Sequence, residues 1–404
     1  MEDFLNILSK ILEVRKPWII EKIEVHHPTK TVNVFIDFEK DSMFECSKCK
    51  QPSKVYDSNY RTWRHLDICD YRCYLNIKIP RTTCKKDGVK VIDKLPFGRM
   101  NSHYSFKFEQ LIMNRIRNTP VSTLSNEIGE PDNNLWRVFR HYIQKALINI
   151  DCSNTTKIGI DEKSYKKGHK YVTIFTDLDT GNVIFVCEGK DESTLARFYE
   201  KLFDMTGDPN YIKLICMDMS KSFISGQKEY FSWVEVVFDK FHIKKGLNEA
   251  IDKVRKKEVV NNESLKKTKY VWLKNPCNLN ANQESLLASF LTECSTDTAK
   301  AYKAKLEFDQ LWSVQQNAVE PLLNEWINRS LNLNLYPINK FIKTIKNHYD
   351  GVLKAMKTLF TNAVSEGLNS LFQLAKYRAR GYRNVNNFIN MIYFTGNNFK
   401  FDFH

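Results

Sequence analysis

Apolar and polar residues alternate along much of the first hundred positions. Residues 17–44 alternate on both sides of Pro28–Lys30, and this period of two predicts two short strands joined by a turn. Residues 72–80 alternate again, with Cys73 and three aliphatic residues on one face. The pattern therefore predicts a small β module over residues 1–98.

The period becomes helical from His103 onward. Three helices are expected: an amphipathic one, a short one stopped by Gly129, and a third that Asp132 can cap. Three helices with a tight glycine-containing turn before the last are typical of a helix-turn-helix. Residues 99–150 are therefore predicted to form a DNA-binding domain of this kind. A generic helical bundle with a solvated basic face is the alternative.

Strands and helices alternate from residue 157 onward. Five strand candidates and two helical stretches over residues 157–258 predict an α/β domain with a mixed sheet. From about residue 260 to residue 350 the pattern is helical only, and the tail is a helix, a Gly-Tyr break and a second helix. We therefore expect a third domain that extends from residue 151 to residue 404.

Composition narrows the class of partner and the compartment. The chain has 404 residues, enough for two or three domains, and Lys+Arg exceed Asp+Glu by 61 to 47, a net charge of +14. This balance favours nucleic acid as a partner. No apolar run approaches the roughly 18 residues that cross a bilayer, and the N-terminus lacks the features of a secretion signal. We expect no membrane association and a cytoplasmic, nucleoid-associated protein, in which the 10 cysteines are thiols or metal ligands.

Two pairs of residues in the β module have the spacing of a metal site. Cys46 and Cys49 are three positions apart, as are Cys84 and Asp87, so three thiolates and one carboxylate could hold a structural Zn²⁺. Either Cys69 or Cys73 could replace Asp87. The alternative is that these cysteines are small buried hydrophobic residues.

Carboxylates close two of the predicted strands. Asp161 and Asp218 each follow an apolar run, and polar groups at the carboxyl ends of strands line the functional crevice of an α/β sheet. A third carboxylate from a helix, best Glu366, would complete a site for two Mg²⁺ (or Mn²⁺) ions of the kind used in phosphoryl transfer. The competing carboxylates are Glu162, Asp177, Asp179, Asp239 and Glu320.

Basic side chains form three groups that could contact DNA. On the third predicted helix the polar face carries Asn133, Asn134, Arg137, Arg140 and Lys145, and the tail adds Lys376, Arg378 and Arg380. Arg and Asn can make bidentate contacts with base edges, whereas Lys and Arg arrays bind phosphates. From Lys240 to Lys274 there are 11 basic and 4 acidic residues. A solvated helix face is the alternative for each group.

Motifs of several other enzyme classes are absent from the sequence. It contains no glycine-rich phosphate loop, no GxGxxG, no GxSxG and no HExxH. These absences argue against an NTPase, a dinucleotide enzyme, a nucleophile-elbow hydrolase and a zinc protease. We therefore expect no nucleotide cofactor.

Several stretches together resemble a known family. They include CSKC (46–49), GIDEKSYKKGHKYVTIFTDLDTG (159–181), ICMDMSKSF (215–223) and TNAVSEGLNS (361–370), and the match runs in order from about residue 20 to residue 400. The sequence closely resembles transposases of the ISL-three insertion-sequence family. The resemblance implies an N-terminal zinc-binding module, a helix-turn-helix and a ribonuclease-H-like catalytic domain with an Asp-Asp-Glu triad.

The resemblance also assigns residues. The family's Ile-Asp-Glu-x-Ser, Met-Asp-Met-Ser and Glu-Gly-Leu-Asn motifs correspond to Asp161, Asp218 and Glu366, and the helical block from about 260 to 350 becomes an insertion in the catalytic domain. The Asp-x-Phe-His motif places Asp239 and His242 near the site. Many relatives have Cys or His where this sequence has Asp87.

The resemblance implies a DNA transposase. It would bind the terminal inverted repeats of its insertion sequence and cleave and transfer DNA strands, with two metal ions in the catalytic site. Both element ends and the target DNA must be held together, so a homodimer or larger assembly is expected. The alternatives are a decayed or domesticated transposase that acts as a sequence-specific DNA-binding protein, and a metal-dependent nuclease that cuts without joining.

Overall fold

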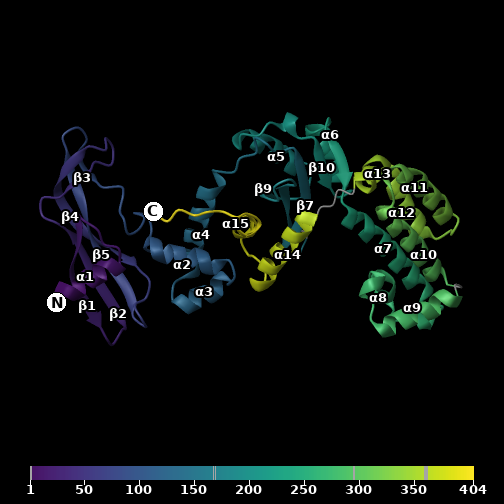
Figure 1. Cartoon of the computed structure of the whole chain (residues 1–404), viewed down its shortest axis with the longest axis horizontal. Coiled ribbons are helices and arrows are strands. Elements are labelled where there is room, and N and C mark those ends of the chain that lie inside the picture. The colour runs from purple at the N-terminus through teal and green to yellow at the C-terminus, as the bar shows by residue number, and fades with distance from the viewer. Residues whose placement is uncertain (1, 167, 169, 294–295, 359–362) are drawn as a thin grey trace. The chain divides into compact units, whose positions relative to one another are not determined.

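The computed structural model of the chain contains two compact units (Figure 1). The structure describes residues 2–166, 168, 170–293, 296–358 and 363–404. The first unit is Met1–Ala146 together with Phe399–His404, and the second is Leu147–Asn398. The chain therefore passes from one unit to the other twice.

A six-stranded mixed sheet forms the core of the first unit. Its elements are α1 (Glu2–Ile11), β1 (Trp18–His26), β2 (Thr31–Phe38), β3 (Met43–Glu45), β4 (Pro52–Arg64), β5 (Arg72–Cys84) and β6 (Gly88–Val91). The strand order is β1-β2-β5-β4-β3, with β6 on β5, and only β2 and β5 run parallel. The inward positions of the alternating strands, such as Val34, Ile36 and Ile77, are fully buried, which is why the period of two found these strands.

Three helices complete the first unit: α2 (Phe106–Ile116), α3 (Val121–Ile128) and α4 (Asp132–Leu147). The Ser105 side chain accepts a hydrogen bond at the start of α2, and Gly129 ends α3 with a φ of 67°, a conformation that favours glycine. The carboxylate of Glu109 in α2 is fully buried but paired with Arg99 at 2.6 Å, and the Tyr142 hydroxyl of α4 donates to it at 2.6 Å. This satisfied charge ties α2 to α4.

A five-stranded mixed sheet organises the second unit. The strands are β7 (Lys157–Lys166), β8 (Lys170–Asp177), β9 (Val183–Glu188), β10 (Leu214–Met217) and β11 (Glu235–Phe238). Their order is β11-β10-β7-β8-β9, with β11, β10 and β7 parallel and β7, β8 and β9 antiparallel. The helices that alternate with these strands or follow them are α5 (Ser193–Asp204), α6 (Lys221–Tyr230), α7 (Lys240–Glu258), α14 (Ala363–Arg378) and α15 (Val385–Gly396).

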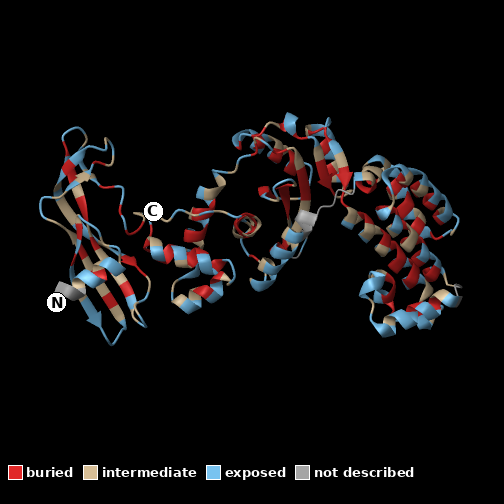
Figure 2. Cartoon of the chain, in the orientation of Figure 1, coloured by how far each residue is buried: buried red, intermediate tan, exposed pale blue. Residues whose placement is uncertain are grey.

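The described residues between α7 and α14 are helical and contain no strand. They form α8 (Lys269–Leu273), α9 (Ala281–Glu293), α10 (Asp297–Gln310), α11 (Gln316–Leu331), α12 (Tyr336–Asn347) and α13 (Tyr349–Thr358), and the chain adds four 3₁₀ turns at Pro209–Tyr211, Glu263–Leu265, Pro276–Asn278 and Leu311–Ser313. These helices share one hydrophobic core with the sheet, because α10 and α12 pack on α7 and α13 packs on β11 (Figure 2). Trp272 and Trp326 are among its fully buried residues.

The fold class is therefore mixed α/β, with two mixed sheets and fifteen α-helices among the described residues. In the same part of the chain, no helix is both long and apolar enough to span a membrane. The division into three domains stays a prediction.

Candidate functional site

Three aspartates lie along one edge of the second sheet. Asp161 is in β7, Asp218 directly follows β10, and Asp239 directly follows β11. These three strands are parallel neighbours, and the register of β10 on β7 and of β11 on β10 brings the aspartates level with one another. The carboxyl ends of parallel strands thus gather acidic groups at one edge.

Asp161 has partners from both its own strand and a distant helix. The Asn369 side chain of α14 donates a hydrogen bond to Oδ2 at 2.6 Å, and the Lys163 ammonium lies 3.2 Å from the same oxygen. The side chains of Asp161 and Lys163 are 12% and 18% exposed, so this pair is mostly shielded from water. Asp161 is therefore held in one orientation, with a cation already beside it.

Asp239 caps the N-terminus of α7, and Asp218 lies two residues before Ser220, which caps α6. Oδ1 of Asp218 accepts the backbone N–H of Ser220 at 2.8 Å, just before α6, and Oδ1 of Asp239 accepts that of Phe241 at 3.0 Å, at the start of α7. Carboxylates are favoured at helix N-termini. Each oxygen has two lone pairs, so these bonds leave capacity for a cation.

His242 lies against the same acidic edge. Its Nδ1 is 3.0 Å from Oδ2 of Asp239, and this hydrogen bond raises the pKa of the imidazole; burial opposes the shift, and the charges of Asp239, Asp161 and Asp218 add to it. His242 thus binds its proton more tightly than an ordinary histidine. The sequence placed Asp239 and His242 near the site, and the structure brings them to its edge.

Glu162 is the remaining carboxylate near this edge. Burial raises the pKa of its side chain, the charge of Lys190 opposes the shift, and the charges of Asp218 and Asp161 add to it. A carboxylate with a raised pKa in such surroundings is a candidate for a role at the site.

The helix α14 carries Glu366, and its side chain lies outside the described residues. Asn369 follows it by less than one turn of the helix. Two turns further on, Lys376 donates to the backbone oxygen of Ser164 and lies 3.1 Å from its hydroxyl. Asn369 and Lys376 therefore tie α14 to β7 at two points. Lys376 is half-buried in this contact, whereas Arg378 and Arg380 are exposed.

The other competing carboxylates have structural partners elsewhere. Asp177 accepts the Thr155 hydroxyl and pairs in the sheet with Ile158, toward the start of β7. Asp179 forms an ion pair with Lys157 at 2.7 Å. Glu320 forms one with Lys357, also at 2.7 Å. The structure does not bring these three carboxylates to the acidic edge.

A separate cluster in the first unit has the composition of a zinc site. The ligand atoms of Cys46, Cys49, Cys84 and Asp87 all lie within 4.8 Å of one another. The sulfurs of Cys49 and Cys84 are 3.4 Å apart, and Oδ2 of Asp87 is 3.6 Å from the sulfurs of Cys46 and Cys84. Tetrahedral Zn²⁺ with bonds of about 2.3 Å separates its sulfur ligands by about 3.8 Å, so the four groups fit this ion.

Hydrogen bonds shift the pKa values of two thiols of this cluster in opposite directions. The Gln51 backbone lowers the pKa of Cys49, but the side chains of Asp87, Cys84 and Cys46 outweigh it and raise that pKa to about 12. The backbone N–H groups of Lys86 and Asp87 hold the pKa of Cys84 below its usual range. The two cysteines that could have replaced Asp87 lie elsewhere: Cys73 is fully buried in the sheet core, and Cys69 is exposed and outside the cluster. The set that the spacing predicted is the one that the fold brings together.

The helix α4 is apolar on one side and basic on the other. Its buried side carries Leu135, Val138, Phe139, Tyr142 and Ile143. Of the predicted DNA-binding residues, Asn133, Arg137, Arg140 and Lys145 are exposed and Asn134 is partly buried. Arg137 donates to Asn134 Oδ1 at 3.3 Å, and Lys145 is 3.9 Å from Asp402 of the C-terminal hexapeptide.

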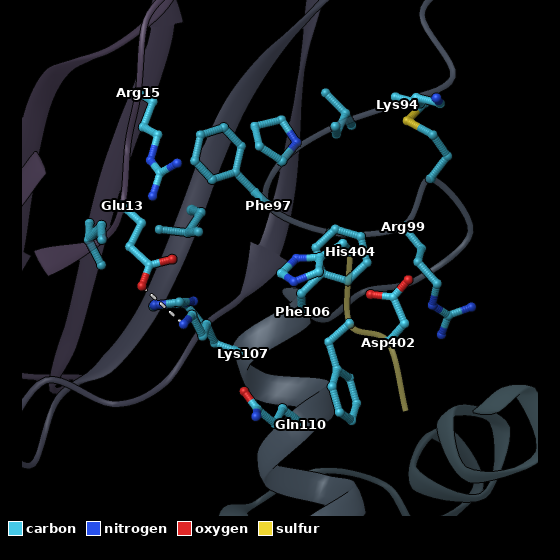
Figure 3. A pocket seen from close by; sticks show the side chains of 18 of the residues that line it. Glu13, Arg15, Lys94, Phe97, Arg99, Phe106, Lys107, Gln110, Asp402 and His404 are labelled. Atoms are coloured by element: carbon cyan, nitrogen blue, oxygen red, sulfur yellow. Dashed lines mark hydrogen bonds and ion pairs between the residues drawn. The ribbon is translucent and has the colours of Figure 1, made fainter. Parts of the chain in front are cut away.

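That hexapeptide also lines a cavity of about 1130 Å³ in the first unit (Figure 3). Half-buried Phe401 and Phe403 alternate with exposed Asp402 and His404, and the Phe403 ring centre is 4.7 Å from that of Tyr142 in α4. The cavity belongs to the first unit, whereas the aspartates belong to the second. It is therefore a different site, and sequence periodicity did not find it.

Comparison with known proteins relates both sites to one family. Residues 158–392, more than half of the chain, match the ISL3 family model described as a transposase. Residues 43–87 match a model described as the zinc-finger of transposase IS204/IS1001/IS1096/IS1165. These segments contain the acidic edge and the cysteine cluster, respectively.

Two insertion-sequence proteins are similar over most of their length. The transposase for insertion sequence element IS1001 of Bordetella parapertussis is 22% identical over 375 residues, which are 90% of this chain and 91% of that protein. The transposase for insertion sequence element IS1557 of Mycobacterium tuberculosis is 22% identical over 374 residues, 84% and 82% of the two chains. The chain belongs to the ISL3, or ISL-three, family of insertion-sequence transposases.

Proposed function

We propose that this transposase binds the terminal inverted repeats of its own insertion sequence and catalyses metal-dependent DNA strand cleavage and strand transfer. Asp161, Asp218 and Glu366 would hold two Mg²⁺ or Mn²⁺ ions. The observation that carries the proposal is the level placement of Asp161 and Asp218 on adjacent parallel strands, beside the helix that carries Glu366.

The donor set suits hard divalent cations. Mg²⁺ and Mn²⁺ prefer carboxylate oxygens. Asp161, Asp218 and Asp239 lie close enough together that the charges of all three act on His242. Lys163 supports this assignment, because its ammonium already balances the charge of Asp161 at the place where a metal ion would do so.

Two ions at such a site would activate a water molecule and neutralise negative charge on the phosphoryl group as it is transferred. The side chains and backbone of the protein orient the proposed metal ligands and the histidine beside them. Asn369 orients Asp161, the Ser220 backbone orients Asp218, and Asp239 holds His242 at the rim. Attack by water would cut the element end, and attack by the freed 3′-hydroxyl would join it to target DNA without a covalent protein–DNA intermediate.

The remaining assignments follow from the same proposal. The second unit would have a ribonuclease-H-like fold with α8–α13 as a helical insertion, and the mixed sheet with acids at strand ends supports this. The helices α2–α4 would form a helix-turn-helix in which the exposed face of α4 contacts DNA. Zn²⁺ would hold the β module together without taking part in the chemistry. A homodimer or larger assembly would hold both element ends.

A plasmid that carries the DNA flanking the gene tests this function. With Mg²⁺, the purified protein should break the plasmid at the element boundaries, and the Asp161→Asn variant should leave it intact. Retarded but uncut DNA, the same for both proteins, would instead favour a DNA-binding protein that has lost its chemistry. Breaks without joining would favour a nuclease.

A further inference from the structure

The helix α7 connects the acidic edge with the helical block. It begins at Lys240, immediately after Asp239, and its 19 residues extend over about 28 Å (Figure 1). Its buried side packs on α8, α10 and α12. Its other side therefore runs along the surface of the second unit, away from the aspartates.

Five lysines on this surface have no carboxylate partner among the described residues. Lys245, Lys253 and Lys257 are exposed on α7 and form no ion pair with any described residue; Lys267 and Lys269, just before and at the start of α8, share both properties. We call these five lysines the α7 basic surface. Their neighbours on the same helix are paired: Lys244 with Asp309, and Lys256 with Asp252.

Part of this surface is concave and aromatic. Lys245 of α7 and Lys269 of α8 line one hollow of about 430 Å³, together with Phe241, which is 55% exposed. Tyr270, next to Lys269, is 61% exposed. Exposed rings stack on the bases of single-stranded nucleic acid, whereas the bases of a duplex are already stacked, so the cations carry the argument for duplex DNA.

The acidic residues of the hollow do not cancel its charge. Asp252 is neutralised by Arg255 at 2.7 Å and Lys256 at 3.0 Å, so Glu249 is the remaining carboxylate against Lys245 and Lys269. The hollow therefore keeps a net positive charge.

We propose that the α7 basic surface binds the phosphate backbone of duplex DNA and guides it away from the cut site; this inference rests on the proposed function. DNA that meets the acidic edge at Asp218 and Asp239 also meets the start of α7. The length of the helix matches about eight base pairs at 3.4 Å each. Binding through phosphates is independent of sequence, so this surface would add affinity rather than specificity.

Salt dependence of DNA binding tests the inference. The probe is a fluorescent 30-base-pair duplex of random sequence, without divalent ions. The variant is Lys245→Gln with Lys253→Gln and Lys257→Gln. Each lost phosphate contact lowers the slope of log affinity against log salt by about 0.9, so three contacts lower it by about 2.7. The triple Lys→Arg variant at the same positions should keep the wild-type slope.

The control removes the same charge from α12. Lys340, Lys343 and Lys346 are exposed and form no ion pair with a described residue, and their replacement by Gln should change the slope by less than 1. Equal slopes for the two Gln variants, or an unchanged slope for the α7 variant, would overturn the inference. This assay contains no divalent ions, so its result does not depend on the proposed catalysis. If the protein cleaves DNA in a separate assay but the α7 variant keeps the wild-type slope, the DNA-binding role of the α7 basic surface is wrong and the proposed function stands.

Discussion

Asp161 is held by two partners that act in different ways. Asn369 fixes the direction of its carboxylate through a hydrogen bond from another element, and Lys163 balances its charge. Groups that orient a metal ligand commonly change activity by 10-fold to 100-fold when they are removed. With Asp161 as a proposed metal ligand, Asn369 would be a positioning residue, although it carries no charge.

Replacement of Asn369 tests this role. We expect Asn369→Ala to slow DNA cleavage by roughly 10-fold to 100-fold while DNA binding stays within about twofold, because only the orientation of Asp161 is lost. Single-turnover cleavage and a binding titration measure the two effects. Asn386→Ala, at an exposed position in α15, is the matched control. Equal rates for the two variants would contradict the role.

The Asp239–His242 pair predicts a pH dependence of stability. Its hydrogen bond raises the pKa of His242 above the ordinary value of 6.5, so the folded state binds the proton more tightly. The pair's contribution is therefore fully present below pH 6.5 or so and is lost as the pH rises through the folded pKa. Urea denaturation in EDTA should show that His242→Gln destabilises the protein by about 1 kcal/mol more at pH 6 than at pH 9.

His348 provides a control of opposite sign. Burial lowers the pKa of its imidazole, so its contribution falls as the pH falls. The destabilisation by His348→Gln should therefore be larger at pH 9 than at pH 6. The same pH trend for both variants would show that the Asp239 pair is not the cause.

At the scale of elements, we expect the β module to depend on its zinc-site cluster. Cys46 and Cys49 follow β3, Cys84 is the last residue of β5, and Asp87 directly precedes β6, so one ion would join the ends of three strands. A structural site of this kind contributes directly to folding. The module should therefore contain one Zn²⁺ and melt at a lower temperature after chelation.

Two cysteine variants distinguish a proposed zinc ligand from a cysteine outside the cluster. Cys84→Ser should lose the zinc and the response to chelator, whereas Cys69→Ser should keep both, because Cys69 is exposed and outside the cluster. Metal analysis and thermal melts measure the difference. Zinc loss in both variants, or zinc in neither the wild type nor the variants, would contradict the assignment.

The exposed face of α4 makes a separate prediction. If Arg137 contacts a base edge, Arg137→Ala should weaken binding to the element end by about 1–3 kcal/mol and leave binding to random DNA nearly unchanged. Competition titrations with the two DNAs measure the difference. An equal loss on both would make Arg137 a phosphate contact and would contradict its role in sequence recognition.

Periodicity found some strands and missed others for a physical reason. The strands β1, β2 and β5 bury one face and were predicted, whereas β4 was not, because it contains the consecutive residues Asp57, Ser58 and Asn59, which favour turns. Pairing with β5 along most of its length overrides that preference. The zinc ligands were predictable because their spacing is local.

At the scale of the whole molecule, contacts between distant segments were beyond the reach of sequence patterns. Asn369 and Asp161 are separated by 208 positions, and only the fold brings them together. The hexapeptide Phe399–His404 belongs to the first unit, although the sequence places it after the last helix of the second. The acids themselves were predictable because strand ends and motif matches mark them.

The two crossings of the chain join the first unit, with its helices α2–α4, to the unit that holds the acidic edge. We propose that the first unit binds the element end and that the second unit cuts it. Binding and cleavage should then respond to different substitutions. The three proposed metal ligands offer the sharpest separation, because their removal deletes a charge without touching the first unit.

The most direct measurement is single-turnover cleavage of a labelled element end in Mg²⁺, with binding measured in parallel. We predict that Asp161→Asn, Asp218→Asn and Glu366→Gln each lower the cleavage rate by about 1000-fold or more, with affinity within about twofold. Glu320→Gln, which removes a surface carboxylate paired with Lys357, should cleave at the wild-type rate. Cleavage that survives in the Asp161 or Asp218 variant would contradict their role as metal ligands, and loss of binding in either variant would contradict the separation of binding from cleavage.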